Sequence, residues 1–156
     1  MNYTMRTLTR TDIEACLKLY KESGERALGI PFKRSFYSII DNQSFYGIFD
    51  EDKLIGTIGW YQLKRSKDYY ITKLCVDTNY KRQGLGKRLM VCAIEDIIRD
   101  FRTSPSIFSF PNIYAEAVVG ASNNAFYQKF GKIVQTKHCQ TRDLYIYKFD
   151  EETLYD

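Results

Sequence analysis

Residues 81–86 of this 156-residue chain, KRQGLG, combine cations and glycines in a pattern that could bind phosphate. Gly84 and Gly86 let backbone N–H groups approach a ligand closely, because glycine carries no side chain. The apolar residues that follow recur at helical spacing and place the glycines at the start of a helix. The free N–H groups and the dipole of a helix start attract anions. The segment therefore predicts an anion-binding turn.

The residues around this turn do not suit an ordinary helix start. No Ser, Thr, Asp or Asn stands there as a side-chain cap, whereas Lys81, Arg82, Lys87 and Arg88 crowd the same end. Exposed cations at that end oppose the helix dipole and cost about 0.3 to 1 kcal/mol each. A bound pyrophosphate would resolve both conflicts. A solvated basic face with a glycine-rich turn is the alternative interpretation.

Two better-known phosphate loops fit this segment less well. The pattern GxxxxGK[ST] of nucleoside triphosphatases is absent from the sequence. The dinucleotide-binding fingerprint needs a third glycine, where this chain has Leu89, and it follows the first strand of a parallel sheet. Neither class of nucleotide site is therefore predicted.

The rest of the chain must supply the elements that hold this turn. Residue patterns predict strands over 3–7, 44–49, 54–62, 69–76, 113–119, 132–139 and 144–149. Helical spacing predicts helices over about 12–24, 33–40, 85–101 and 123–129. Strands 44–76 should form an antiparallel meander. The order β-α-α-β-β-β-α-β-α-β-β predicts a three-layer α/β fold, a mixed but mostly antiparallel sheet of about seven strands with helices on both faces.

Composition favours one soluble domain over residues 1–156. Apolar residues make up 44% and charged residues 27%, and a net charge of +4 is too mild to indicate nucleic-acid binding. No apolar run approaches the roughly 20 residues that span a bilayer, and no signal peptide is visible. The four cysteines form no CxxC pair, so no metal site is expected. We expect a cytoplasmic protein, with no membrane or nucleic-acid partner.

Residues 76–86, VDTNYKRQGLG, resemble the acetyl-coenzyme A signature of the GNAT superfamily of N-acetyltransferases. In that signature a strand ending near "VD" precedes Arg or Gln, two variable residues, Gly, one variable residue, and Gly or Ala. Lys81 replaces the usual Arg or Gln and keeps the charge, and Arg82 stands where Gly is frequent. The segments GTIGW at 56–60 and FYQKFG at 126–131 also fall where the family has counterparts, so the resemblance covers nearly the whole chain.

The resemblance implies acetyl-coenzyme A as cosubstrate, bound without a metal. It implies that backbone amides of residues 83–86, with Lys87, bind the pyrophosphate. The backbones of Leu74 and Val76 would pair with the pantetheine arm like an added strand. Asn123 or Asn124 would contact the arm from the other side. The full cofactor-binding set is Leu74, Val76, Lys81, Arg82, Gln83, Gly84, Leu85, Gly86, Lys87, Asn123, Asn124 and Phe126.

Acetylation of an amine needs a neutral nucleophile, a stabilised oxyanion and a proton for the departing thiolate. By resemblance, Tyr127 is the general acid, and the backbone N–H of Val76 stabilises the oxyanion. Glu116 is the candidate base, because a lone carboxylate in an apolar strand is costly unless it is used or paired. A cross-strand salt bridge for Glu116 and a water relay in its place remain alternatives. No catalytic role is predicted for His138, the single histidine.

The sequence does not identify the acceptor, which could be a small-molecule or a peptide amine. In the family the first two helices, a loop and the final hairpin build the acceptor cleft. The residues there are rings and acids, which would suit a cationic amine but could equally be core: Tyr20, Glu22, Glu25, Phe32, Phe36, Tyr37, Tyr61, Tyr145 and Tyr147. A non-catalytic coenzyme A sensor is the main alternative function, and a homodimer is considered beside a monomer.

Overall fold

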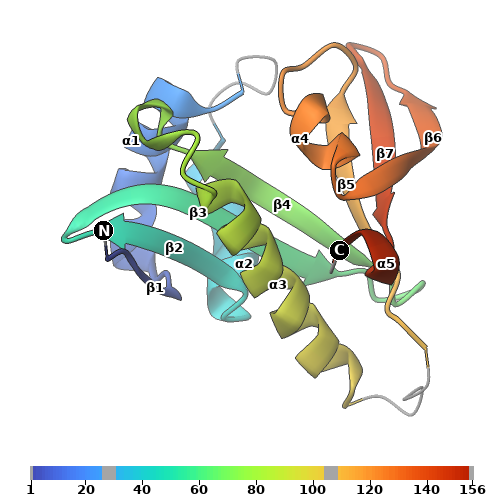
Figure 1. Cartoon of the computed structure of the whole chain (residues 1–156), viewed down its shortest axis with the longest axis horizontal. Helices are drawn as coiled ribbons and strands as arrows, with labels where there is room; N and C mark the ends of the chain where they lie inside the picture. The colour runs from blue at the N-terminus through green and yellow to red at the C-terminus, as the bar shows by residue number, and fades with distance from the viewer. Residues whose placement is uncertain (1, 26–30, 104–108, 155–156) are drawn as a thin grey trace.

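The computed structural model describes residues 2–25, 31–103 and 109–154. Seven strands form one sheet in the order β1-β2-β3-β4-β5-β7-β6, as Figure 1 shows. The strands are β1 (Thr4–Thr7), β2 (Phe45–Asp50), β3 (Lys53–Gln62), β4 (Tyr69–Val76), β5 (Ile113–Val118), β6 (Gly131–His138) and β7 (Asp143–Phe149). Among the described strands, β4 and β5 alone pair in parallel, whereas the other neighbours are antiparallel. The predicted mixed sheet of seven strands is confirmed.

Helices cover both faces of the sheet, as predicted. The helices are α1 (Ile13–Ser23), α2 (Tyr37–Asp41), α3 (Leu85–Phe101), α4 (Asn124–Gln128) and α5 (Glu151–Leu154). In Figure 1, α3 crosses in front of the central strands, and α1 and α2 lie behind them. Each face has its own apolar cluster: α3 and α4 pack into one, and α1 and α2 pack into the other. We call these faces the α3 face and the α1 face.

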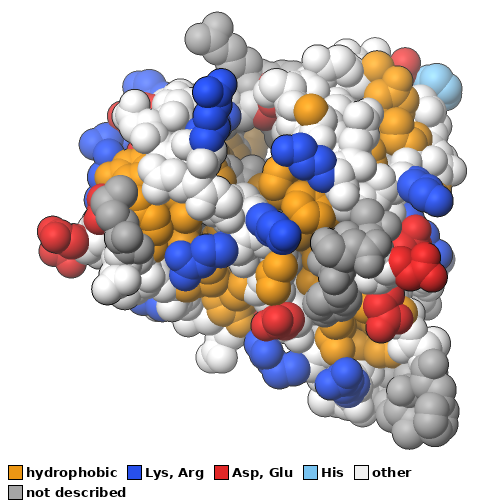
Figure 2. All heavy atoms as spheres, in the orientation of Figure 1, with side chains coloured by type: hydrophobic (Ala, Val, Ile, Leu, Met, Phe, Trp, Pro, Cys, Tyr) orange, Lys and Arg blue, Asp and Glu red, His pale blue; other side chains and the backbone are white. Residues whose placement is uncertain are grey.

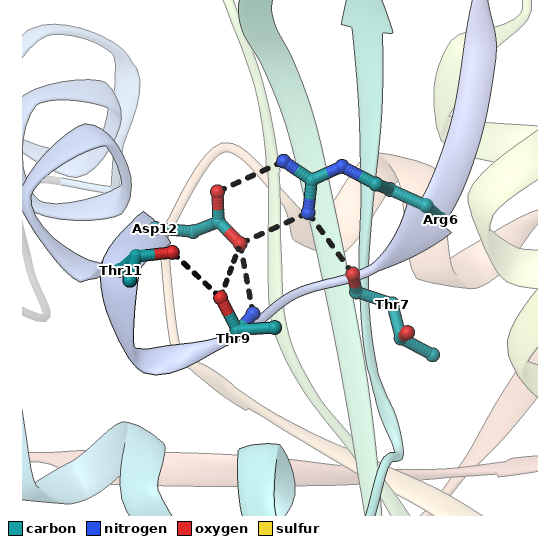
Figure 3. Close-up of polar contacts among 5 residues, drawn as sticks. All are labelled: Arg6, Thr7, Thr9, Thr11 and Asp12. Carbon is teal, nitrogen blue, oxygen red and sulfur yellow. Dashed lines mark hydrogen bonds and ion pairs between the residues drawn. The ribbon is translucent and has the colours of Figure 1, made fainter.

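A capping box between Thr9 and Asp12 precedes α1. The Asp12 carboxylate accepts a hydrogen bond from the backbone N–H of Thr9 (2.8 Å), which closes a capping box with the short 3-10 turn Arg10–Asp12. Arg6 on β1 donates two further bonds to the same carboxylate, at 2.9 and 3.0 Å (Figure 3). These contacts fix α1 to the first strand.

Two details differ from the prediction. The second helical segment begins as a 3-10 turn, Lys33–Phe36, before α2. Helix α5 was not predicted. Cys16 and Cys75 lie in the core, and Cys92 is half-buried. The sequence indicates that Ser104 and Pro105 end α3, and these two residues lie outside the described residues. No helix within the described ranges is both long and apolar enough to cross a bilayer.

Candidate functional site

The turn before α3 has the uncapped start that the sequence predicts. Gly84 is the N-cap residue in the left-handed region (φ 75°), and no side chain caps the helix. Arg82 is also left-handed (φ 67°), which explains why glycine would suit that position. The Gln83 amide oxygen accepts a hydrogen bond from the Tyr3 hydroxyl (2.6 Å), so the N-terminal segment holds this turn. The first turn of α3 thus has backbone N–H groups that no described side chain caps, as the predicted anion site requires.

The two glycines of the turn serve different purposes. A Cβ on Gly84 would meet nothing within 4 Å, so this position needs glycine for its backbone angle. A Cβ on Gly86 would lie 2.9 Å from Cε1 of Phe126. Close approach of a ligand is the predicted reason for both glycines, and the structure adds a second reason at Gly86, the ring of Phe126 on α4 that packs against the start of α3.

Positive side chains surround this turn. Lys81, Arg82, Lys87 and Arg88 are all exposed. None of them forms an ion pair with a carboxylate that the structure describes. Figure 2 shows Lys and Arg side chains spread over the face that carries α3. This unpaired positive charge suits a ligand with several phosphate groups.

Strands β4 and β5 pair over only three residues each, Tyr69 to Ile71 with Ile113 to Ala115. The two strands then diverge, as Figure 1 shows. The N–H of Asp77 donates to Ile55 on β3, and successive residues of a strand point their N–H groups to opposite sides. The N–H groups of Val76 and Leu74 therefore point to the side that β5 has left. These two N–H groups are the ones predicted to pair with the pantetheine arm of acetyl-coenzyme A.

The adjacent asparagines at the start of α4 differ in what they contact. The Asn124 amide donates to the carbonyls of Val118 (2.8 Å) and Ala121 (2.9 Å), and its oxygen accepts from Tyr147 (2.7 Å). The Oδ1 atom of Asn123, in contrast, is buried without a hydrogen-bond partner within the described structure. A buried amide oxygen without a donor is costly, so Asn123 is the better candidate to bind a ligand.

Tyr127, the predicted acid, is 5% exposed and packs against Tyr147 and Phe149, with ring centroids 5.5 and 5.9 Å apart. Burial raises its pKa, so the phenol stays protonated. No hydrogen bond to its hydroxyl is found within the described ranges. Burial raises the pKa of Tyr20 on α1 as well, and Tyr127 adds a small electrostatic effect to that shift.

Glu116, the predicted base, lies one residue beyond the last residue of β5 that pairs with β4. Its neighbours Ala115 and Ala117 belong to the cluster on the α3 face, so its side chain points to the α1 face. The carboxylate helps to raise the pKa of Tyr61 and of Tyr70 there, after the larger effect of burial. Opposite it on β7 stands Ile146, and no described cation forms the salt bridge considered as an alternative.

The remaining sequence candidates lie apart from this centre or in the core. His138 is exposed at the end of β6, with Nδ1 3.1 Å from Oδ1 of Asp143. Tyr20, Phe36 and Tyr147 are core residues, and Phe32 is 78% exposed. Three neighbouring strands of the α1 face carry half-buried rings: Tyr61 and Tyr70 stack at 5.6 Å, and Tyr70 and Tyr114 lie 5.5 Å apart. Sequence reasoning did not single out Tyr70 or Tyr114, which alternate with apolar residues.

A sequence profile of the acetyltransferase (GNAT) family matches residues 13–131. Among curated protein sequences none shows significant similarity to the chain. Solved structures share the fold at low identity. Ard1 from Thermoplasma volcanium is 17% identical, with a TM-score of 0.75 over 97% of this chain and 100% of that one. The ribosomal-protein-S18-alanine N-acetyltransferase from Escherichia coli is 14% identical, with a TM-score of 0.72 over 95% and 93%. The PaiA N-acetyltransferase from Thermoplasma acidophilum, in complex with coenzyme A, is 17% identical, with a TM-score of 0.68 over 96% and 100%.

Proposed function

The chain belongs to the acetyltransferase (GNAT) family, whose members use acetyl-coenzyme A, and from this premise we propose that it acetylates a primary amine with Tyr127 as the general acid. The observation that carries the proposal is a set of three features without partners among the described residues: the uncapped start of α3, the edge of β4 beyond its pairing with β5, and the Asn123 oxygen at α4, whose Phe126 packs against Gly86 of α3. We also propose that residues 1–156 form one domain and that the enzyme acts in the cytoplasm.

The candidate binding residues form three regions, and each region would contact a different part of acetyl-coenzyme A. The N–H groups of Gln83, Gly84, Leu85 and Gly86, with Lys87, would hold the pyrophosphate, and Lys81 and Arg82 would add charge. The open edge at Leu74 and Val76 would pair with the amide groups of the pantetheine arm. Asn123 would donate or accept on the opposite side of the arm. When bound, the cosubstrate supplies an activated acetyl group as a thioester.

The acid and the base approach the reaction centre from two sides of the sheet. Tyr127 comes from the cluster on the α3 face and would donate its proton to the departing sulfur. Glu116 points to the α1 face and would accept a proton from the incoming ammonium, directly or through water. The backbone N–H of Val76 would stabilise the oxyanion. The acceptor amine would therefore enter from the α1 face.

The half-buried tyrosines beside Glu116 support an acceptor that lies along the α1 face. Tyr61, Tyr70 and Tyr114 form one continuous aromatic surface that leads to the point where β4 and β5 separate. Both a small amine with an apolar part and the free amino terminus of a peptide would fit such a surface, so we propose a primary amine as the common chemical group.

A Tyr127→Phe variant tests the proposal most directly. The substitution removes only a hydroxyl that has no partner within the described residues, so stability should change by less than about 0.5 kcal/mol. Loss of a general acid should lower kcat by about 10²-fold or more. Turnover would be measured by thiol release over a panel of primary amines and peptides. Binding of coenzyme A, measured by calorimetry, should be unchanged.

The same measurements separate an enzyme from the alternative, a coenzyme A sensor. Acetyl-coenzyme A at about 100 times its dissociation constant should stabilise either protein by about 2.7 kcal/mol. Only the enzyme should release thiol when an amine is added. A wild type that binds acetyl-coenzyme A tightly and acetylates no amine in the panel would favour the sensor. A Tyr127→Phe variant with full turnover would contradict the assigned acid.

A further inference from the structure

Strand β4 contains a bulge at the point where it leaves β5. Thr72 pairs with Gly59 of β3 and Cys75 pairs with Thr57, so β4 has one more residue between these pairs than β3. Lys73 lies inside this bulge in the left-handed region, with φ 56°. A left-handed lysine is unfavourable, because its Cβ crowds the following carbonyl. Some other contact must hold this conformation.

Two hydroxyl groups hold the bulge through one atom, the carbonyl oxygen of Lys73. Tyr20 Oη and Thr57 Oγ1 each lie 2.8 Å from that oxygen, and they lie 2.5 Å from one another. Thr57 is fully buried and Tyr20 is 9% exposed, so water does not compete easily for these contacts. Two hydroxyl protons serve three short contacts. One hydroxyl therefore donates to the carbonyl, and the other donates to its hydroxyl neighbour.

The bulge decides which backbone groups face the open edge. Before it, Tyr69 and Ile71 turn their side chains to the cluster on the α3 face. After it, Leu74 and Val76 pack against that same cluster, and Cys75 belongs to the cluster on the α1 face. The extra residue thus shifts the alternation by one position. Without it, Lys73 and Cys75 would direct their N–H groups to the open edge in place of Leu74 and Val76.

We propose that Tyr20 and Thr57 are positioning residues, which hold the Lys73 carbonyl so that the backbone N–H of Val76 is aimed as the oxyanion donor. This inference rests on the proposed acetyl transfer. Neither hydroxyl touches the reacting atoms, because both are bound to the carbonyl on the α1 face.

The shared carbonyl predicts a specific pattern among variants. In Tyr20→Phe, Thr57 can still donate to the carbonyl, and in Thr57→Val, Tyr20 can still donate. Each single variant should therefore lower kcat by about threefold or less. The double variant leaves the carbonyl without a donor and should lower kcat by about 10²-fold, as for loss of an oxyanion donor. Thr57→Ser keeps the hydroxyl and should match the wild type. Ile13→Val, in the same core cluster, is the control for a small loss of stability.

A spectroscopic measurement tests the positioning itself, without any acceptor. The carbonyl stretch of acetyl-coenzyme A labelled with ¹³C at the thioester should move to lower frequency on binding to the wild type, because an N–H donor polarises it. In the double variant this shift should disappear while the affinity for coenzyme A stays the same. An unchanged shift in the double variant, or an additive loss of kcat across the two single variants, would overturn the proposal.

The outcomes distinguish this inference from the proposed function. If the wild type shows the frequency shift but acetylates no amine, the transfer reaction fails and the positioning role stands. If the wild type acetylates amines and shows no shift, the positioning role fails and the enzyme assignment stands. A double variant that no longer binds coenzyme A would also contradict the positioning role, because the hydroxyl pair would then shape the whole open edge.

Discussion

Replacing Gly86 by Ala should impair turnover more than cofactor binding. A Cβ at this position points to α4 and would lie 2.9 Å from Cε1 and 3.3 Å from Cζ of Phe126. Phe126 cannot retreat freely, because its ring centroid lies 4.9 Å from that of Phe130. The next residue along α4 is Tyr127, the proposed acid. The substitution therefore displaces the catalytic side of the site and leaves the phosphate turn in place.

The size of the effect follows from two opposing terms. Alanine is favoured over glycine within a helix by up to about 1 kcal/mol. Overpacking of a tight contact costs about 1 to 3 kcal/mol. Carbon atoms pack best at about 3.5 to 4.0 Å, so the Phe126 ring must move by about 0.5 to 1 Å. We expect a net loss of about 1 kcal/mol in the free energy of unfolding. A displacement of that size at a catalytic group can lower kcat by about 10²-fold.

Gly84→Ala is the matched control, because its Cβ would meet nothing within 4 Å. Gly84→Ala should lower the free energy of unfolding by about 1 to 2 kcal/mol, because alanine is unfavourable at a left-handed backbone angle. It should also weaken coenzyme A binding, and neither effect should change when Phe126 is substituted. The assays are urea unfolding, calorimetry with coenzyme A and steady-state turnover. Adding Phe126→Leu should recover the lost free energy of unfolding in the Gly86→Ala variant but not in the Gly84→Ala variant. A Gly86→Ala enzyme with normal kcat and weak coenzyme A binding would refute this assignment of the two glycines.

Four further predictions concern single residues. Asp12→Asn should cost about 1 kcal/mol at pH 7. The Arg6 hydrogen bonds lower the pKa of Asp12 in the folded protein. The contribution of Asp12 to the free energy of unfolding is therefore complete above the unfolded pKa near 4 and disappears as pH falls through the lower folded pKa. Urea unfolding at pH 7 and pH 3 measures this difference. Arg82→Gly should raise the unfolding free energy by up to about 1 kcal/mol, because φ is 67°, yet weaken coenzyme A binding in calorimetry. Asn123→Ala should raise the Kd for coenzyme A with little change in Tm, whereas Asn124→Ala, which loses three hydrogen bonds, should lower Tm. Glu116→Gln should lower kcat/KM by about 10²-fold in steady-state turnover if the carboxylate is the base.

The sequence predicts the sheet well because its signals are local. Alternation and turn residues mark the hairpin between β2 and β3, and apolar spacing marks α3 almost to its last residue. The uncapped, cation-rich start of α3 is visible in the sequence for the same reason. Helix α5 was missed, because four residues after Phe149 are too few to show a helical period.

The features that were missed or left open depend on contacts between distant segments. Nothing in the strand that contains Lys73 marks a bulge, since lysine has no preference for left-handed angles, and the hydroxyls that hold it come from positions 20 and 57. The purpose of Gly86 depends on Phe126, which lies 40 positions away. The choice between Asn123 and Asn124 depends on the turn before α4, where only Asn124 meets the carbonyls of Val118 and Ala121.

The open edge of β4 therefore depends on three elements: β4 itself, β3 and α1. Of the five described non-glycine residues with positive φ, only Lys73 lies inside a strand. Its strain is offset by a hydroxyl from α1 and one from β3, so both of these elements hold the bulge in β4. Helix α1 also covers the face from which the acceptor would enter. An acceptor that moves α1 would then leave the Thr57 hydroxyl as the donor to the Lys73 carbonyl, so acceptor binding would be coupled to the aim of the Val76 N–H and not to the affinity for coenzyme A.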